Sequence, residues 1–172
     1  STEKLGDPLH PFEAFTASVC NLRPESRGHI RIKSPDASEP PLIQPDYLSA
    51  PEDRKVAADA IKLTRKIVSA PAMEKYQPQE FKPGTEYASD EELAREAGNI
   101  GTTIFHPVGT CKMGPVTDNY AVVDDRLRLH GISGVRVVDA SVMPTITSGN
   151  TNSPTLMIAE KASEMIKEDW KG

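Results

Sequence analysis

The clearest periodic pattern in the chain is helical. Apolar residues at helical spacing are Val56, Ala60, Leu63 and Ile67. Acidic residues open this stretch, and Arg65 and Lys66 lie near its end, which is the charge order that a helix dipole favours. We therefore predict a helix from about Glu52 to Ser69, preceded by capping-box spacing in Ser49-Ala-Pro-Glu52.

Two further segments have helical signatures. The spacing of Ser89-Asp-Glu-Glu92 predicts a capped, short helix that ends near Gly98. Near the C-terminus, Ser153 and Pro154 suit the N-cap and the first position of a helix. The apolar stripe of that helix comprises Ile158, Ala162, Met165 and Ile166.

Other segments read as strands and turns. We predict a strand over residues 14–20 and a second over residues 29–33, joined through a turn at residues 25–28. The second strand alternates polar and apolar residues, as expected where one face is buried and the other is wet. Residues 34–45 contain four prolines and read as a loop. The mostly apolar run at residues 135–138 predicts a buried strand that runs parallel to its neighbours.

Composition excludes several classes of function. The net charge of −5 and the scattered positive residues argue against nucleic-acid binding. No apolar run approaches the length of a membrane span. Cys20 and Cys111 are too few for a disulfide framework, although they could pair. The sequence also lacks a Gly-x-Gly-x-x-Gly fingerprint, a P-loop, a Gly-x-Ser-x-Gly elbow and zinc-ligand spacing. We therefore expect no metal site.

One histidine has a distinctive setting, in the segment Phe105-His-Pro-Val-Gly-Thr-Cys-Lys-Met-Gly114. Pro107 restricts the backbone after His106, and Gly109 permits a tight turn or the close approach of a planar ligand. A histidine held in this way suits proton transfer near neutral pH. Taken alone, these residues also fit a loop histidine without a chemical role, which is the simpler interpretation.

The polar segment Ser148-Gly-Asn-Thr-Asn-Ser-Pro-Thr155 precedes the last predicted helix. The simplest interpretation is a loop with a good helix cap. Alternatively, the free N–H groups at the helix start could face a ligand and stabilise an anion such as a reduced flavin or a phosphate. Asn150 and Asn152 would add hydrogen-bond donors and acceptors there.

In order along the chain, these segments resemble the glucose–methanol–choline (GMC) oxidoreductases. The segments that carry the resemblance are 105–114, Ala121-Val-Val-Asp-Asp-Arg-Leu-Arg-Leu-His-Gly131, Gly134-Val-Arg-Val-Val-Asp-Ala-Ser-Val-Met-Pro144 and 149–155. Residues 28–34 and 41–48 also resemble the family's substrate domain. The resemblance covers nearly the whole chain from about Phe12.

The resemblance implies a role for each matched residue. His106 stands at the position of the catalytic histidine, which accepts the proton of an alcohol hydroxyl. Asn150 stands where members carry His or Asn as the second catalytic residue, and Asn is typical of the branch that resembles choline dehydrogenase. Residues implied to contact FAD are Asp139, Ala140, Asn152, Pro154 and Thr155. The implied activity is oxidation of a small alcohol to a carbonyl, with FAD as the hydride acceptor.

The resemblance also implies an organisation. We expect an α+β fold in which residues 1–99 belong to a substrate-binding domain, with an antiparallel sheet covered by helices. Residues 100–172 would supply the catalytic loop and the last strand and helix of an FAD-binding domain. The family's N-terminal FAD-binding half is absent from this sequence and would be its partner. We expect a cytoplasmic or membrane-peripheral location.

Two other functions fit the same residues. Without the cofactor half, the chain could be a free-standing binding module that performs no chemistry. The scaffold is also similar to that of flavin-dependent hydroxynitrile lyases, which transfer no net electrons. Bleaching of a flavin by an alcohol distinguishes an oxidoreductase from a lyase.

Because the glycine fingerprint that holds the FAD phosphates is absent, we predict that the 172-residue chain alone binds no flavin and is inactive. Absorbance spectroscopy of the purified chain tests this expectation. A yellow preparation with a flavin spectrum would contradict it.

Overall fold

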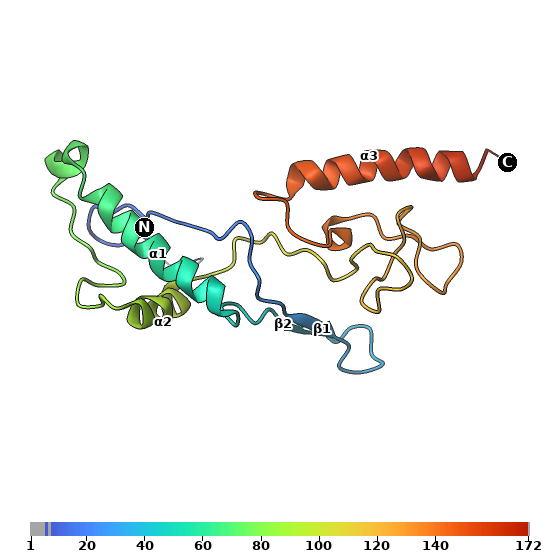
Figure 1. Ribbon diagram of the computed structural model, residues 1–172, viewed down its shortest axis with the longest axis horizontal. Coiled ribbons are helices and arrows are strands. Elements are labelled where there is room, and N and C mark those ends of the chain that lie inside the picture. The colour runs from blue at the N-terminus through green and yellow to red at the C-terminus, as the bar shows by residue number, and fades with distance from the viewer. Residues whose placement is uncertain (1–5, 7, 172) are drawn as a thin grey trace. The chain divides into compact units, whose positions relative to one another are not determined.

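The computed structural model describes residue 6 and residues 8–171, and it has an α+β fold (Figure 1). The strands are β1 (His29–Arg31) and β2 (Leu42–Gln44), and the α-helices are α1 (Pro51–Val68), α2 (Asp90–Ile100) and α3 (Asn152–Asp169). Two 3-10 helices, η1 (Pro71–Tyr76) and η2 (Ala140–Val142), complete the elements. The chain forms two compact units. The first contains residues 1–21 and 54–100, and the second contains residues 22–53 and 101–172.

The predicted helices of the first unit are confirmed. Ala58 of α1 and Leu93 of α2 are buried, whereas the polar faces of both helices are exposed. The capping box of α2 forms as predicted, because the Glu92 N–H donates to Ser89 Oγ at 3.3 Å and the Ser89 N–H donates to Glu92 Oε2 at 3.0 Å. An ion pair between Lys62 and Asp90 joins the two helices.

A single guanidinium fixes the loop between α1 and α2. Arg65 donates to both carboxylate oxygens of Glu80, from Nε and Nη2, at 2.8 Å each. It also donates to the carbonyls of Tyr87 and Gly84 at 2.9 Å. The hydrogen bonds from Arg65 to Glu80, together with the charge of Arg65, lower the pKa of Glu80 below its ordinary value although burial opposes the shift.

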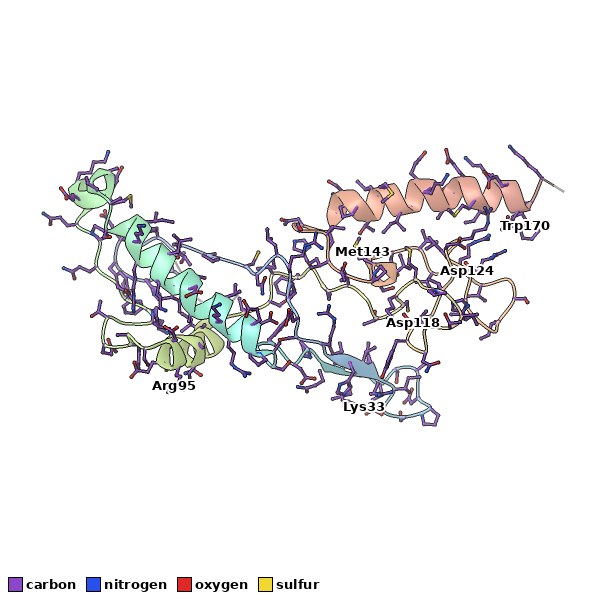
Figure 2. The ribbon with its side chains drawn as sticks, viewed as in Figure 1. Lys33, Arg95, Asp118, Asp124, Met143 and Trp170 are labelled. Carbon is purple, nitrogen blue, oxygen red and sulfur yellow. The ribbon has the colours of Figure 1, made fainter. Side chains whose placement is uncertain are left out.

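The second unit contains a compact hydrophobic core. Its buried members are Val123, Leu127, Val142, Met143, Ile158 and Ala162. The last two belong to α3, so this helix packs its predicted apolar face against the preceding loops, with Met143 close to the helix in Figure 2. Arg126 holds the other end of α3 through the Met165 carbonyl at 3.0 Å and the Asp169 carboxylate at 2.8 Å.

The strand predicted over residues 29–33 is confirmed in part as β1, but its pairing differs from the prediction. Residues 14–20 form no strand, and β1 pairs instead with β2, inside the proline-containing segment predicted to be a loop. The prolines flank β2 rather than enter it, so they remove no ladder hydrogen bond. All residues of both strands are exposed, contrary to the predicted buried face. Gly28 is required before β1, because a Cβ there would lie 2.1 Å from the Gln44 carbonyl oxygen.

Two predictions for the C-terminal region are also corrected. Residues 135–138 form no strand. Arg136 makes only an isolated bridge with Arg128, and Val135 is exposed. Helix α3 begins earlier than predicted: Thr151 is its N-cap and Pro154 is its third residue. Over the described residues, no helix is both long and apolar enough to cross a bilayer.

We predict that Val142→Ala destabilises the second unit by about 2 kcal/mol, because it removes two methyl groups from a fully buried site and leaves a cavity. Urea unfolding measures the change. The matched control is Val135→Ala, since Val135 is 44% exposed and its truncation should change stability little. Equal effects of the two variants would contradict the core described above.

We predict that Glu80→Gln lowers the free energy of unfolding by about 1–2 kcal/mol near neutral pH, because it breaks the two-pronged contact with Arg65. The pKa of Glu80 is lower in the folded state than in the unfolded state, so the ionised carboxylate stabilises the fold. This stabilisation is complete above the unfolded-state pKa and disappears as the pH falls through the folded-state pKa. The variant should therefore lose less stability than the wild type on acidification below about pH 5. Glu164→Gln, in an exposed pair with Lys161, is the control and should have almost no effect. Parallel acid profiles for wild type and Glu80→Gln would refute the interpretation.

Candidate functional site

His106 and Asn150 lie side by side although they are 44 residues apart in sequence. The Asn150 amide nitrogen is 2.8 Å from His106 Nε2. Asn150 is exposed and His106 is half-buried, so the edge of the pair that carries Nε2 lies at the surface of the second unit. The structure thus brings together the two side chains that were predicted to be catalytic.

The backbone on either side of His106 is restricted. Phe105 has a left-handed φ of 63°, a conformation that non-glycine residues rarely adopt, and its N–H is held by Thr103 Oγ1 at 3.0 Å. Pro107 follows His106, and Gly109 takes a positive φ of 89°. A bulky residue keeps a left-handed conformation only where its surroundings require it, so the surrounding structure holds this loop in one defined conformation.

Residues 105–114, the histidine loop, are hydrogen-bonded to the core of the second unit. The Cys111 N–H donates to the Ser141 carbonyl at 3.0 Å, and the Met113 N–H donates to the Val142 carbonyl at 2.8 Å. Lys112 pairs with Asp118 at 2.7 Å, and this hydrogen bond lowers the pKa of Asp118 below its ordinary value. The Lys112 ammonium group therefore takes part in an ion pair with Asp118.

Thr151 contacts the opposite side of the imidazole. Its hydroxyl lies 3.0 Å from His106 Nδ1, and its backbone N–H lies 3.4 Å from the same atom. Thr151 is only 7% exposed. Thr151 was not among the predicted site residues, because its neighbours in the sequence indicate only a polar loop before a helix.

The residues implied to contact FAD occupy two places. Asp139 caps η2, since its carboxylate accepts a hydrogen bond from the Ser141 N–H at 2.8 Å, and Ala140 begins that turn. Residues 152, 154 and 155 lie in the first turn of α3, directly after Thr151. Thr155 closes this turn by donating from its N–H and from its hydroxyl to the Thr151 carbonyl, at 3.0 and 2.6 Å.

The residues beside His106 suit one part of a flavin. The first-turn N–H groups of Asn152 and Ser153 precede the first helical hydrogen bond, and both residues are exposed. Such donors, together with the positive end of the helix dipole, favour an electron-rich ring next to His106. These residues suit the ring end of the cofactor, and the sequence has no Gly-x-Gly-x-x-Gly fingerprint of the kind that holds its phosphates.

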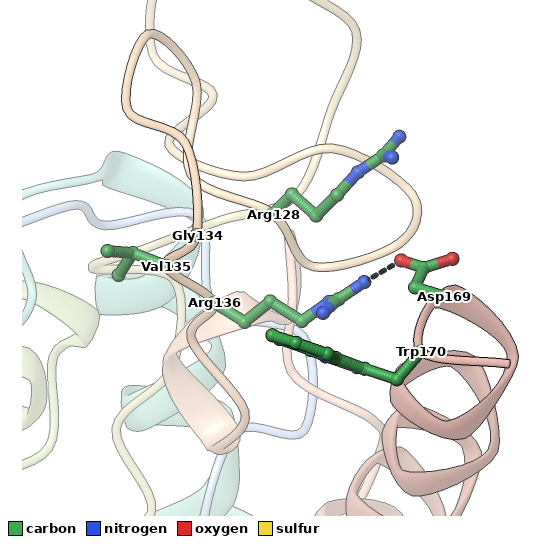
Figure 3. A pocket seen from close by; sticks show the side chains of 6 residues that line it. All are labelled: Arg128, Gly134, Val135, Arg136, Asp169 and Trp170. Atoms are coloured by element: carbon green, nitrogen blue, oxygen red, sulfur yellow. Dashed lines mark hydrogen bonds and ion pairs between the residues drawn. The ribbon is translucent and has the colours of Figure 1, made fainter. Parts of the chain in front are cut away.

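A separate hollow lies near the C-terminal end of α3, as Figure 3 shows. It is lined by Arg128, Gly134, Val135, Arg136, Asp169 and Trp170. Both arginines already have carboxylate partners, Asp124 and Asp169. An anion would have to displace those partners, so this hollow is a weaker candidate than the surface at His106. Within residues 8–171, no group of three or more potential ligands could hold a metal ion.

The other histidines and the cysteines have ordinary settings. His130 Nε2 lies 3.1 Å from the Gly114 carbonyl oxygen, and His29 lies 3.9 Å from Asp46. Cys20 and Cys111 are free thiols.

Comparison with known proteins gives one consistent match. The family model described as "GMC oxidoreductase" matches residues 24–159. The chain is 47% identical over 152 residues to an alcohol dehydrogenase [acceptor] of Pseudomonas putida, and 48% identical over 153 residues to an oxygen-dependent choline dehydrogenase of Klebsiella pneumoniae. These alignments cover 88% and 89% of this chain but 27% of each relative.

A solved structure shares the fold. An FAD-dependent oxidoreductase from Chaetomium thermophilum superposes with a TM-score of 0.80 at 29% identity, over 86% of this chain and 26% of that protein. The chain therefore spans about a quarter of the length of the proteins it matches.

Proposed function

This chain belongs to the glucose–methanol–choline oxidoreductase family, whose members use FAD, and on that premise we propose that it supplies the proton-accepting part of an alcohol-oxidising site. The observation that carries the proposal is the contact of His106 Nε2 with the Asn150 amide at 2.8 Å, at the surface of the second unit. The products of the reaction are a carbonyl compound and the reduced flavin.

His106 is the general base. An alcohol is a poor hydride donor until its hydroxyl proton begins to leave, so a base at the oxygen makes the hydride on the neighbouring carbon transferable. Nε2 is the nitrogen that can meet the hydroxyl, because Nδ1 faces buried Thr151. FAD, when bound, supplies the acceptor for the hydride.

Asn150 positions the alcohol. In the structure its amide nitrogen occupies the place in front of Nε2 that a hydroxyl would take. Asn150 is exposed, so rotation of its side chain to admit an alcohol oxygen should cost little. The amide can then donate to that oxygen while Nε2 accepts the proton, which fixes the oxygen between two groups and supports the negative charge that develops on it.

We assign the FAD contacts and the roles of residues 1–99 and 100–172 as the family resemblance implies. The first turn of α3, with Asn152, Pro154 and Thr155, lies beside the flavin ring, and the backbone of Asp139 and Ala140 contacts the cofactor. Residues 100–172 contribute the catalytic loop, and residues 1–99 contribute to substrate binding. An FAD-binding region outside this chain completes the enzyme, in keeping with the 27% of each relative's length that the chain covers. The substrate is a small alcohol.

We predict that His106→Ala, in the FAD-loaded enzyme that includes this chain, slows flavin reduction by an alcohol about a hundred- to ten-thousand-fold, the usual contribution of a general base. Anaerobic stopped-flow absorbance measures the rate with choline, 1-butanol and benzyl alcohol as probes. The control is Glu164→Gln, a change at an exposed residue of α3 that should leave the rate unchanged.

Two results would overturn the proposal. One is an unchanged rate of flavin reduction in His106→Ala. The other is a wild-type flavin that stays oxidised with every alcohol, which would instead favour a lyase or a binding module on the same scaffold.

A further inference from the structure

We propose that Thr151 is a positioning residue whose hydroxyl holds the neutral His106 ring in the tautomer with the proton on Nδ1 and a free lone pair on Nε2. The inference rests on the proposed function, because only a base at Nε2 requires this tautomer. It concerns a residue that neither the motifs nor the family resemblance singled out.

Thr151 occupies a helix N-cap without acting as one. A threonine at this position ordinarily accepts a hydrogen bond from the second or third N–H of the helix. Here no side-chain cap forms, and the third residue of α3, Pro154, has no N–H to offer. The hydroxyl turns instead to His106 Nδ1 at 3.0 Å. Since Thr151 is 7% exposed, solvent offers the hydroxyl little alternative.

Donor and acceptor accounting at the imidazole favours one tautomer. If Nδ1 carries the proton, it donates to Thr151 Oγ1, and the Nε2 lone pair accepts from the Asn150 amide at 2.8 Å. In the opposite tautomer the Nε2 proton would meet the amide hydrogens of Asn150, so the amide would have to turn over and present its oxygen. The two side-chain contacts, from Asn150 and from the Thr151 hydroxyl, therefore fit the same tautomer.

The backbone N–H of Thr151 favours the opposite tautomer of His106. Its N–H lies 3.4 Å from Nδ1, and an N–H donor favours an unprotonated nitrogen. The hydroxyl is closer by 0.4 Å, the difference between 3.4 and 3.0 Å, and it can accept the Nδ1 proton. Removing the hydroxyl alone leaves Nδ1 facing only the backbone donor, which selects the tautomer that cannot act as a base at Nε2.

The same hydroxyl also serves the ring after proton transfer. Once Nε2 has taken the alcohol proton, both ring nitrogens carry hydrogen, and the Nδ1 hydrogen needs an acceptor. Thr151 Oγ1 is that acceptor, whereas the backbone N–H opposes the charged ring. One side chain thus supports the base before and after it acts.

The test compares Thr151→Val, which keeps the shape and removes the hydroxyl, with Thr151→Ser, which keeps the hydroxyl. The FAD-loaded enzyme is labelled with 15N-histidine, and the shifts of Nδ1 and Nε2 report the tautomer of the neutral ring. The His106 signals are assigned by their loss in His106→Gln. Thr64→Val is the matched control, because Thr64 Oγ1 donates to the Ala60 carbonyl at 2.9 Å inside α1.

We expect the wild type, Thr151→Ser and Thr64→Val to have the proton on Nδ1, and Thr151→Val to move it to Nε2. We also expect flavin reduction by the best alcohol probe to fall about ten- to a hundred-fold in Thr151→Val, the size of effect known for residues that orient metal-ligating histidines, and to be largely retained in Thr151→Ser. If Thr151→Val does not fold, Thr151→Ala is measured in the same way.

The outcomes separate this inference from the proposed function. A wild-type tautomer in the hydroxyl-free variant, or the same loss in Thr151→Ser as in Thr151→Val, would overturn the role of the hydroxyl even if His106→Ala is inactive. An active His106→Ala would overturn the proposed function itself, whatever the tautomer of the ring.

Discussion

The imidazole of His106 is held between two polar groups from consecutive residues, the Asn150 amide at Nε2 and the Thr151 hydroxyl at Nδ1. Each contact constrains one ring nitrogen, so together they limit both the rotation of the ring and the position of its proton. Because Asn150 and Thr151 adjoin the start of α3, the geometry of the site depends on where that helix begins. A small change at the helix start would alter both contacts at once.

The rest of the second unit supports this arrangement. Buried Ile158 and Ala162 fix α3 against the core, and the arginine contacts at its far end fix its direction. The histidine loop is bonded to η2 through Cys111 and Met113, and Val142 and Met143 beside that turn belong to the same core. The two segments that carry the site therefore share one set of buried side chains, which explains how residues 44 positions apart keep a hydrogen-bond distance.

The sequence allowed prediction of the helices, of strand β1 and of the His106–Asn150 pair, but not of β2 or of its pairing with β1. Helices α1 and α2 depend on local signals, namely apolar spacing and the Ser89–Glu92 cap, which the chain itself contains. Strand pairing depends on distant partners, and β2 formed within a segment whose prolines suggested a loop. Thr151 was missed for a related reason: its role depends on His106, which no local pattern around residue 151 reveals.

A crystal structure of the FAD-loaded enzyme with trifluoroethanol would show whether His106 and Asn150 bind one alcohol oxygen beside a flavin. We expect a single alcohol oxygen within about 3 Å of both His106 Nε2 and the Asn150 amide nitrogen. An alcohol bound elsewhere, or the two side chains held apart once FAD is present, would contradict it.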